Sequence, residues 1–306
     1  MWSDVPVSSW GRNKGEDPVG LAEVCAADHL RFDEKVWRRI TGKLKTAGVN
    51  MIVLDVGEGL VYPSHPELGV RGSWSAERLN AEVKRLAAEG IEVVPKLNFS
   101  TAHDTWLKDY GKMVSSAVYY RVVTDLLKDV YDIFDRPRFI HLGYDEETYA
   151  CQSKYSFAVV RKGELWWHDF LFIVNTAEKL GARAWIWADY CWHHKDEFLK
   201  RTPKSVMLSN WYYGAEFDPA KLKSAYHRPA LAAFSELDAA GFEQIPCGSS
   251  INTDVNFPRL VDFARKNLRP ELLKGFLMAA WCGPTLERNA AKHLHAVDIM
   301  IKAARR

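Results

Sequence analysis

A unit of helix, glycine and apolar strand recurs along the chain and limits what the chain can fold into. Residues 34–47 and 76–89 carry apolar side chains at the three- and four-residue spacing of an amphipathic helix. Each helix is followed by a glycine, which adopts without strain the left-handed conformation common just past a helix end. An apolar run then begins. The glycines in this position are Gly48, Gly90, Gly181 and Gly241.

The apolar runs predict parallel strands. Nearly continuous apolar strands indicate a sheet covered on both faces, and repeated strand–helix units indicate an α/β fold. Eight such units match a closed (β/α)8 barrel, the TIM barrel, better than an open doubly wound sheet. We therefore predict a single barrel domain over residues 1–306, with an irregular lead-in at 1–21 and a closing helix at about 286–304. The predicted strands are residues 22–28, 50–55, 92–98, 138–145, 183–189, 205–211, 242–247 and 274–281.

Composition argues against several classes of protein. The formal net charge is +2, whereas nucleic-acid-binding proteins usually carry a clustered basic face. No apolar run reaches the length of a membrane span. The start, Met1–Asp4, is not a signal peptide, although it is compatible with an export signal removed earlier. The five cysteines are widely spaced and form no C-x-x-C pair, so we expect neither a zinc site nor a disulfide framework. Neither the compartment nor the oligomeric state follows from the sequence.

Polar and aromatic side chains gather at the predicted carboxyl ends of the strands, where barrels carry their catalytic groups. The chain has twelve tryptophans. Such rings stack on the apolar faces of sugars, while carboxylates and amides bind the hydroxyls. We therefore predict a carbohydrate substrate, and neither a nucleic-acid nor a membrane partner. The predicted substrate-binding residues are Asp28, Arg31, Asp55, Asn98, His103, His141, Trp187, Asp189, Trp211, Tyr212 and Trp281.

The segment 139–146 carries the predicted catalytic pair, Asp145 and Glu146. A regular pleat would send these two carboxylates to opposite faces, so the strand must end or bulge here for both to reach one substrate. Two carboxyls in one pocket do not both ionise easily, and we expect one pKa to rise, as a general acid requires. The alternative is a surface acidic turn, because Glu147 continues the acidic run.

The sequence of this segment, H-L-G-Y-D-E, resembles the H-x-G-G-D-E signature of family 20 glycoside hydrolases, the β-N-acetylhexosaminidases. Other strands agree in order. Asp28-His29-Leu30-Arg31 resembles the D-x-x-R of that family, and the segment from Pro95 to His103 resembles its P-E-[IV]-D-x-P-G-H. Trp187-Ala188-Asp189 resembles its W-x-D, while Trp211 and Trp281 match positions of aromatic pocket walls.

The chain also departs from the family pattern. Tyr144 replaces a glycine, Asn98 stands where the family has Asp, and Asp55 falls where the family usually has His. No tyrosine occurs near residues 245–250, where the family places the one that binds the acetamido carbonyl. The small N-terminal domain usual in the family is absent from this sequence. These differences leave the Asp145–Glu146 pair intact and leave the identity of the sugar open.

The resemblance implies a retaining glycosidase that acts by substrate assistance, in which the 2-acetamido oxygen attacks the anomeric carbon. In that mechanism Glu146 is the general acid and base, Asp145 orients the acetamido group, Asp28 and Arg31 hold hydroxyls, and neither a metal nor an organic cofactor is needed. Two alternatives stay open. One is a glycosidase with a conventional carboxylate nucleophile, for which the seventh strand offers only Glu243, at its wrong end. The other is a sugar-binding barrel without turnover.

Overall fold

The structure, a computed structural model, describes residues 27–152 and 158–304. In these residues parallel strands alternate with helices, which confirms the α/β class. The predicted lead-in at 1–21 and most of the predicted strand at 22–28 lie outside the described residues. The strands are β1 (Met51–Asp55), β2 (Glu92–Lys96), β3 (Phe139–His141), β4 (Arg183–Trp187), β5 (Met207–Ser209), β6 (Cys247–Ser249) and β7 (Leu277–Ala279). The α-helices are α2 (Glu34–Thr46), α3 (Ala76–Ala88), α4 (Ala117–Ile133), α5 (Tyr149–Gln152), α6 (Glu164–Leu180), α7 (Lys195–Arg201), α8 (His227–Ala239), α9 (Asn256–Asn267) and α10 (Glu287–Ala304).

The helices begin and end at local sequence signals. Asp33 caps α2 by accepting a hydrogen bond from Lys35 N at 2.8 Å, and Ser75 and Ser116 cap α3 and α4 in the same way. The four glycines of the repeated unit have positive φ angles, 71° at Gly48, 80° at Gly90, 101° at Gly181 and 82° at Gly241. The predicted helix–glycine–strand unit is therefore confirmed after Gly48, Gly90 and Gly181, which β1, β2 and β4 follow directly.

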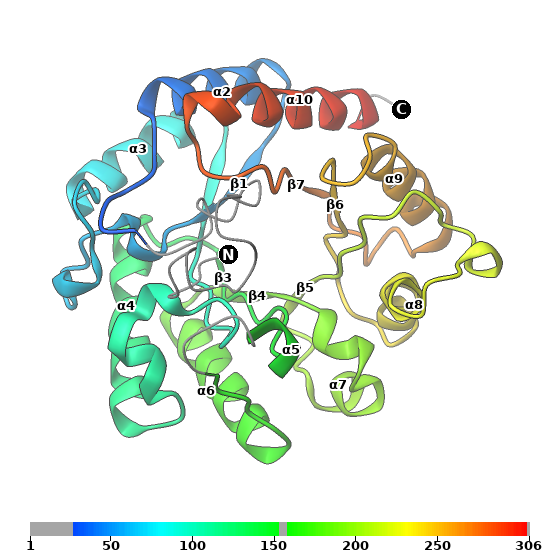
Figure 1. The fold of residues 1–306 in the computed structure, drawn as a ribbon, viewed down its shortest axis with the longest axis horizontal. Coiled ribbons are helices and arrows are strands. Elements are labelled where there is room, and N and C mark those ends of the chain that lie inside the picture. The colour runs from blue at the N-terminus through cyan, green and yellow to red at the C-terminus, as the bar shows by residue number, and fades with distance from the viewer. Residues whose placement is uncertain (1–26, 153–157, 305–306) are drawn as a thin grey trace, which may run out of the picture. The chain divides into compact units, whose positions relative to one another are not determined.

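The described residues form two compact units, the first made of residues 27–31 and 50–184. In this unit β1 pairs in parallel with β2, and the last pair in register is Asp55 with Lys96. Strand β2 pairs in parallel with β3 through Lys96 and His141. The parallel register therefore puts Asp55, Lys96 and His141 next to one another at the carboxyl ends of three strands. Helices α4 and α6 lie side by side in Figure 1.

Strand β3 is shorter than predicted. It ends at His141 instead of reaching residue 145. Gly143 and Tyr144 have φ angles of 78° and 71°, in the left-handed region, and a pleated strand cannot continue through such residues.

The second unit contains residues 32–49 and 185–304. In it Trp185–Trp187 of β4 pairs in parallel with β5, and β6 pairs in parallel with β7. A bridge between Trp211 and Cys247 links the segment after β5 to the start of β6. Helices α2 and α10 lie side by side at the top of Figure 1.

The predicted strand at 242–247 is displaced. Gln244 forms only isolated bridges, and the continuous strand β6 begins at Cys247. Pro246 lies between them and has no N–H to give to a ladder, which interrupts the pairing at this point. No helix in the described ranges is long and apolar enough to cross a membrane.

Candidate functional site

The turn after β3 presents the acidic pair. Three of its residues have positive φ angles, 78° at Gly143, 71° at Tyr144 and 58° at Glu146. A Cβ atom on Gly143 would lie 1.8 Å from Asn98 Oδ1, so only glycine fits against the segment that follows β2. Because the pleat is broken ahead of the pair, Asp145 and Glu146 need not point to opposite faces.

Both carboxylates reach the same imidazole, that of His103. Its Nε2 atom lies 3.2 Å from Asp145 Oδ2 and 3.3 Å from Glu146 Oε2. Burial opposes the charged form of His103, which is 6% exposed, but the two carboxylates outweigh burial and raise its pKa to about 9. His103 is therefore protonated at neutral pH, and both contacts are ion pairs.

Asp145 is held as a carboxylate. Its Oδ1 accepts a hydrogen bond from Asn98 Nδ2 at 2.8 Å, and its backbone oxygen accepts one from Ser100 Oγ. Burial alone would raise the pKa of Asp145, but the charges on His103 and Lys96 and the bond from Asn98 bring it below its ordinary value. The expected rise in one pKa of the acidic pair is thus not found at Asp145, because a cation lies beside it.

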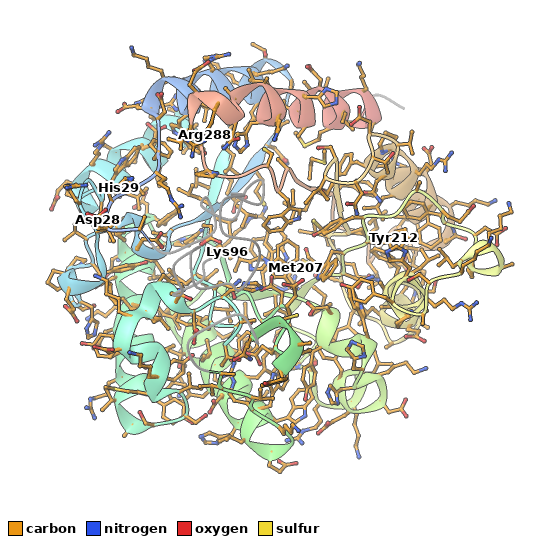
Figure 2. The ribbon with its side chains drawn as sticks, viewed as in Figure 1. Asp28, His29, Lys96, Met207, Tyr212 and Arg288 are labelled. Atoms are coloured by element: carbon orange, nitrogen blue, oxygen red, sulfur yellow. The ribbon has the colours of Figure 1, made fainter. Side chains whose placement is uncertain are left out.

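A second cation, Lys96, lies beside this turn and was not predicted. Its amine forms an ion pair with Asp55 (Lys96 is labelled in Figure 2). Burial and the charge on Lys96 hold the pKa of His141 well below its usual value, so His141 is neutral. His141 Nδ1 accepts a hydrogen bond from Gly143 N at 3.1 Å, so the ring supports the turn. The sequence signal that could have identified Lys96 was its position at the end of an otherwise apolar run, V-V-P-K.

Asp28 and Arg31, which were predicted to follow the first strand, lie in different surroundings. Asp28 is 78% exposed and pairs with His29 at 2.8 Å and with Arg71 at 3.5 Å. Figure 2 shows Asp28 and His29 together and away from Lys96. Arg31 is half-buried and interacts with the charge of Glu58, a residue of the 3-10 helix Gly57–Gly59 that was absent from the predicted site. Burial and the charge on Asp55 raise the pKa of Glu58, and Arg31 opposes that rise.

The predicted aromatic residues gather in the second unit. The ring centroids of Trp187 and Trp281 are 6.2 Å apart, and Trp281 is 45% exposed. Trp211 donates a hydrogen bond from Nε1 to Asp189 Oδ1 at 3.2 Å. This group contains an exposed ring, Trp281, and a carboxylate, Asp189, that is only 8% exposed; both are residue types that were predicted to bind a sugar.

Tyr212 lies in the core instead of beside these rings. It is 2% exposed, its hydroxyl donates to Glu216 O at 2.6 Å, and its ring packs edge-on against Phe217. Tyr213, which was not predicted, stacks on Trp211 with centroids 5.1 Å apart. Alternation along an extended segment puts residues 211 and 213 on one face and residue 212 on the other, so the sequence signal for Tyr213 in place of Tyr212 was its two-residue spacing from Trp211.

Within residues 27–152 and 158–304, no group of three or more His, Cys, Asp or Glu side chains is arranged to hold a metal ion. Cys151, Cys191, Cys247 and Cys282 are free thiols.

Comparisons with known proteins identify the fold. No protein-family profile and no curated protein matches the chain. Among solved structures, the Flavobacterium johnsoniae chitobiase matches with a TM-score of 0.62 at 14% identity, over 92% of this chain and 49% of that one. The chain has the fold of a family 20 glycoside hydrolase barrel. The exo-β-N-acetylglucosaminidase of Vibrio harveyi, solved with N-acetylglucosamine, matches with a TM-score of 0.62 at 14% identity over 90% of this chain. Dispersin B matches with a TM-score of 0.54 at 16% identity, over 87% of this chain and 94% of that one.

The predicted TIM-barrel fold and the resemblance to family 20 are thereby confirmed at the level of the fold. The chain spans about half the length of the chitobiase and of the Vibrio harveyi enzyme, 49% and 52% respectively. At 14–16% identity the roles of individual residues stay predictions.

Proposed function

We propose that this chain is a retaining glycoside hydrolase that cleaves a β-linked N-acetylhexosamine, or a related 2-acetamido sugar, by substrate assistance. The observation that carries the proposal is the contact of His103 with both Asp145 and Glu146, at 3.2 Å and 3.3 Å. The imidazole of His103 can carry a proton, and it contacts two adjacent carboxylates in a chain that has the barrel fold of family 20. In this proposal residues 1–306 form one catalytic domain.

Each carboxylate has a separate task. Asp145 is held ionised by its neighbours. It accepts a hydrogen bond from the acetamido N–H and stabilises the positive charge that develops on the cyclic intermediate. The acetamido oxygen bonds to the anomeric carbon while the glycosidic bond breaks. Glu146 gives a proton to the leaving oxygen. It then takes a proton from a water molecule. This water attacks the anomeric carbon and breaks its bond to the acetamido oxygen, which opens the cyclic intermediate.

His103 supplies the proton to this cycle. Its raised pKa keeps it charged at neutral pH, and it lies 3.3 Å from Glu146 Oε2. A bound sugar excludes water, which disfavours the separated charges of the His103–Glu146 pair. The proton is then transferred to Glu146 and on to the leaving group. The proton that Glu146 later takes from water returns to His103 when the sugar leaves, which restores the starting state. Asp28, Arg31, Asp55 and the aromatic residues Trp187, Trp211 and Trp281 stay predicted sugar-binding residues.

The alternative nucleophile has no support from geometry. Glu243 forms an ion pair with Lys274 at 2.9 Å and precedes β6, whereas catalytic groups of barrels follow their strands.

A panel of aryl glycosides with and without a 2-acetamido group tests the proposal. We expect release of the aryl group only from β-linked 2-acetamido sugars. Turnover of a plain hexoside would favour the conventional mechanism. Sugar binding by titration calorimetry with no turnover of any member of the panel would favour a binding barrel.

A further inference from the structure

Glu147, the third acidic residue of the turn, is not a surface residue. Its side chain is 4% exposed. Its Oε1 accepts a hydrogen bond from Thr101 N at 2.9 Å and pairs with Arg161, and its Oε2 accepts one from Trp166 Nε1 at 2.5 Å. Both oxygens are therefore bound to protein groups, which ties the end of the turn to the segment after β2 and to α6.

Arg161 joins this carboxylate to the scaffold. Its side chain is 1% exposed, and its NH1 atom lies 3.1 Å from Asp169 Oδ2 on α6. Asp169 is also buried and accepts hydrogen bonds from Ser115 Oγ at 2.6 Å and from the hydroxyl of Tyr120 on α4. The planar guanidinium can hold two carboxylates at once in a fixed geometry, which a lysine amine cannot reproduce.

The same guanidinium lies near the other end of the turn. The Arg161 Cζ atom is 5.4 Å from the ring centroid of Tyr144, whose ring also packs edge-on against Trp166 and Phe170 of α6. Tyr144 and Glu146 both have positive φ angles. Such angles are unfavourable for residues other than glycine and persist only where the surroundings hold them.

We propose that Glu147 and Arg161 are positioning residues that clamp both ends of the Tyr144–Glu147 turn and so hold Asp145 and Glu146 against His103. A buried ion pair is weak evidence for stability, because burying its charges is costly; here it fixes a backbone conformation next to the acidic pair. An effect of this clamp on turnover rests on the proposed function, whereas its effect on the positions of Asp145 and Glu146 does not.

The test compares Glu147→Gln and Arg161→Lys with Glu82→Gln as a matched control. Glu82 is 5% exposed and forms an ion pair with the 29% exposed Arg85 at 2.7 Å within α3, so its loss removes a partly buried ion pair far from the turn in sequence. The first measurement is the pKa of His103 by NMR titration of the full-length chain. We expect about 9 in the wild type and in Glu82→Gln, and a fall of about 1 unit or more in the two clamp variants.

The second measurement is the split between kcat and KM on the aryl 2-acetamido substrate. Misplacing the carboxylates should lower kcat by about 10²-fold with little change in KM, while Glu82→Gln keeps both values. Circular dichroism and thermal melts establish that each variant is folded at the assay temperature. If Glu147→Gln fails to fold, the gentler Arg161→Lys carries the test.

An unchanged His103 pKa in a folded clamp variant would overturn the positioning role, whatever the activity. If the wild type cleaves none of the 2-acetamido substrates, the proposed function fails while the NMR titration still decides the role of the clamp.

Discussion

Asn98 donates a hydrogen bond from Nδ2 to Asp145 Oδ1 at 2.8 Å. The orientation of the amide is fixed by its other end, because Asn98 Oδ1 accepts from Ser100 N at 3.0 Å. Residue 98 therefore acts as a donor toward the acidic pair, a task that the Asp found at this position in the resembling family could not perform while ionised.

Asn98→Asp should move the pH dependence of the proposed activity. A new carboxylate beside Asp145 disfavours a second negative charge, so the acidic limb of the kcat/KM profile should shift upward by about 1 unit. Asn98→Ala removes the donor without adding charge and serves as the control. If the two variants give the same profile, charge repulsion at this position is not the cause.

Glu146→Gln should keep the fold and remove most turnover, by on the order of 10²–10⁴-fold, as for loss of a general acid and base. The loss should be smaller on aryl glycosides whose leaving group needs no proton. Rates on a series of leaving groups of graded acidity check this. Equal losses across the series would remove Glu146 from the acid role.

Asp145→Asn separates the two glycosidase mechanisms. The amide keeps the shape of the side chain but loses the charge that would stabilise the cyclic intermediate, so kcat should fall while sugar binding persists. A thiazoline mimic of that intermediate should bind the wild type more tightly than the product sugar, and this advantage should shrink in the variant. A covalent bond trapped between Asp145 and a 2-fluoro sugar would contradict substrate assistance.

His103 should make folding stability depend on pH. Its folded pKa, about 9, lies above its ordinary value of 6.5, so its stabilising contribution is fully present below pH 6.5 and is lost as pH rises through 9. The difference in unfolding free energy between the wild type and His103→Gln should therefore shrink by about 3 kcal/mol across that window. Urea titrations at several pH values measure it, and a constant difference would show that His103 is neutral in the folded chain.

The barrel class and the positions of most strands followed from local signals in the sequence. A glycine just past a helix is a property of a few neighbouring residues, so Gly48, Gly90 and Gly181 predicted the helix–glycine–strand units that the structure contains. The acidic pair was also visible, because Asp145 and Glu146 follow an apolar run directly.

Tertiary structure decided how those groups act. Asp145 and Glu146 meet His103 only because the chain turns left-handed after His141. Residues outside the turn contact it, among them Thr101, which precedes Glu147 by 46 residues and donates a hydrogen bond from its backbone N–H to that carboxylate. The sequence alone assigned no role to Glu147 and gave no partner for Lys96. Periodicity and composition report which residues are buried, but the free energy of a buried charge depends on which opposite charge lies within a few ångströms, and the fold alone sets that distance.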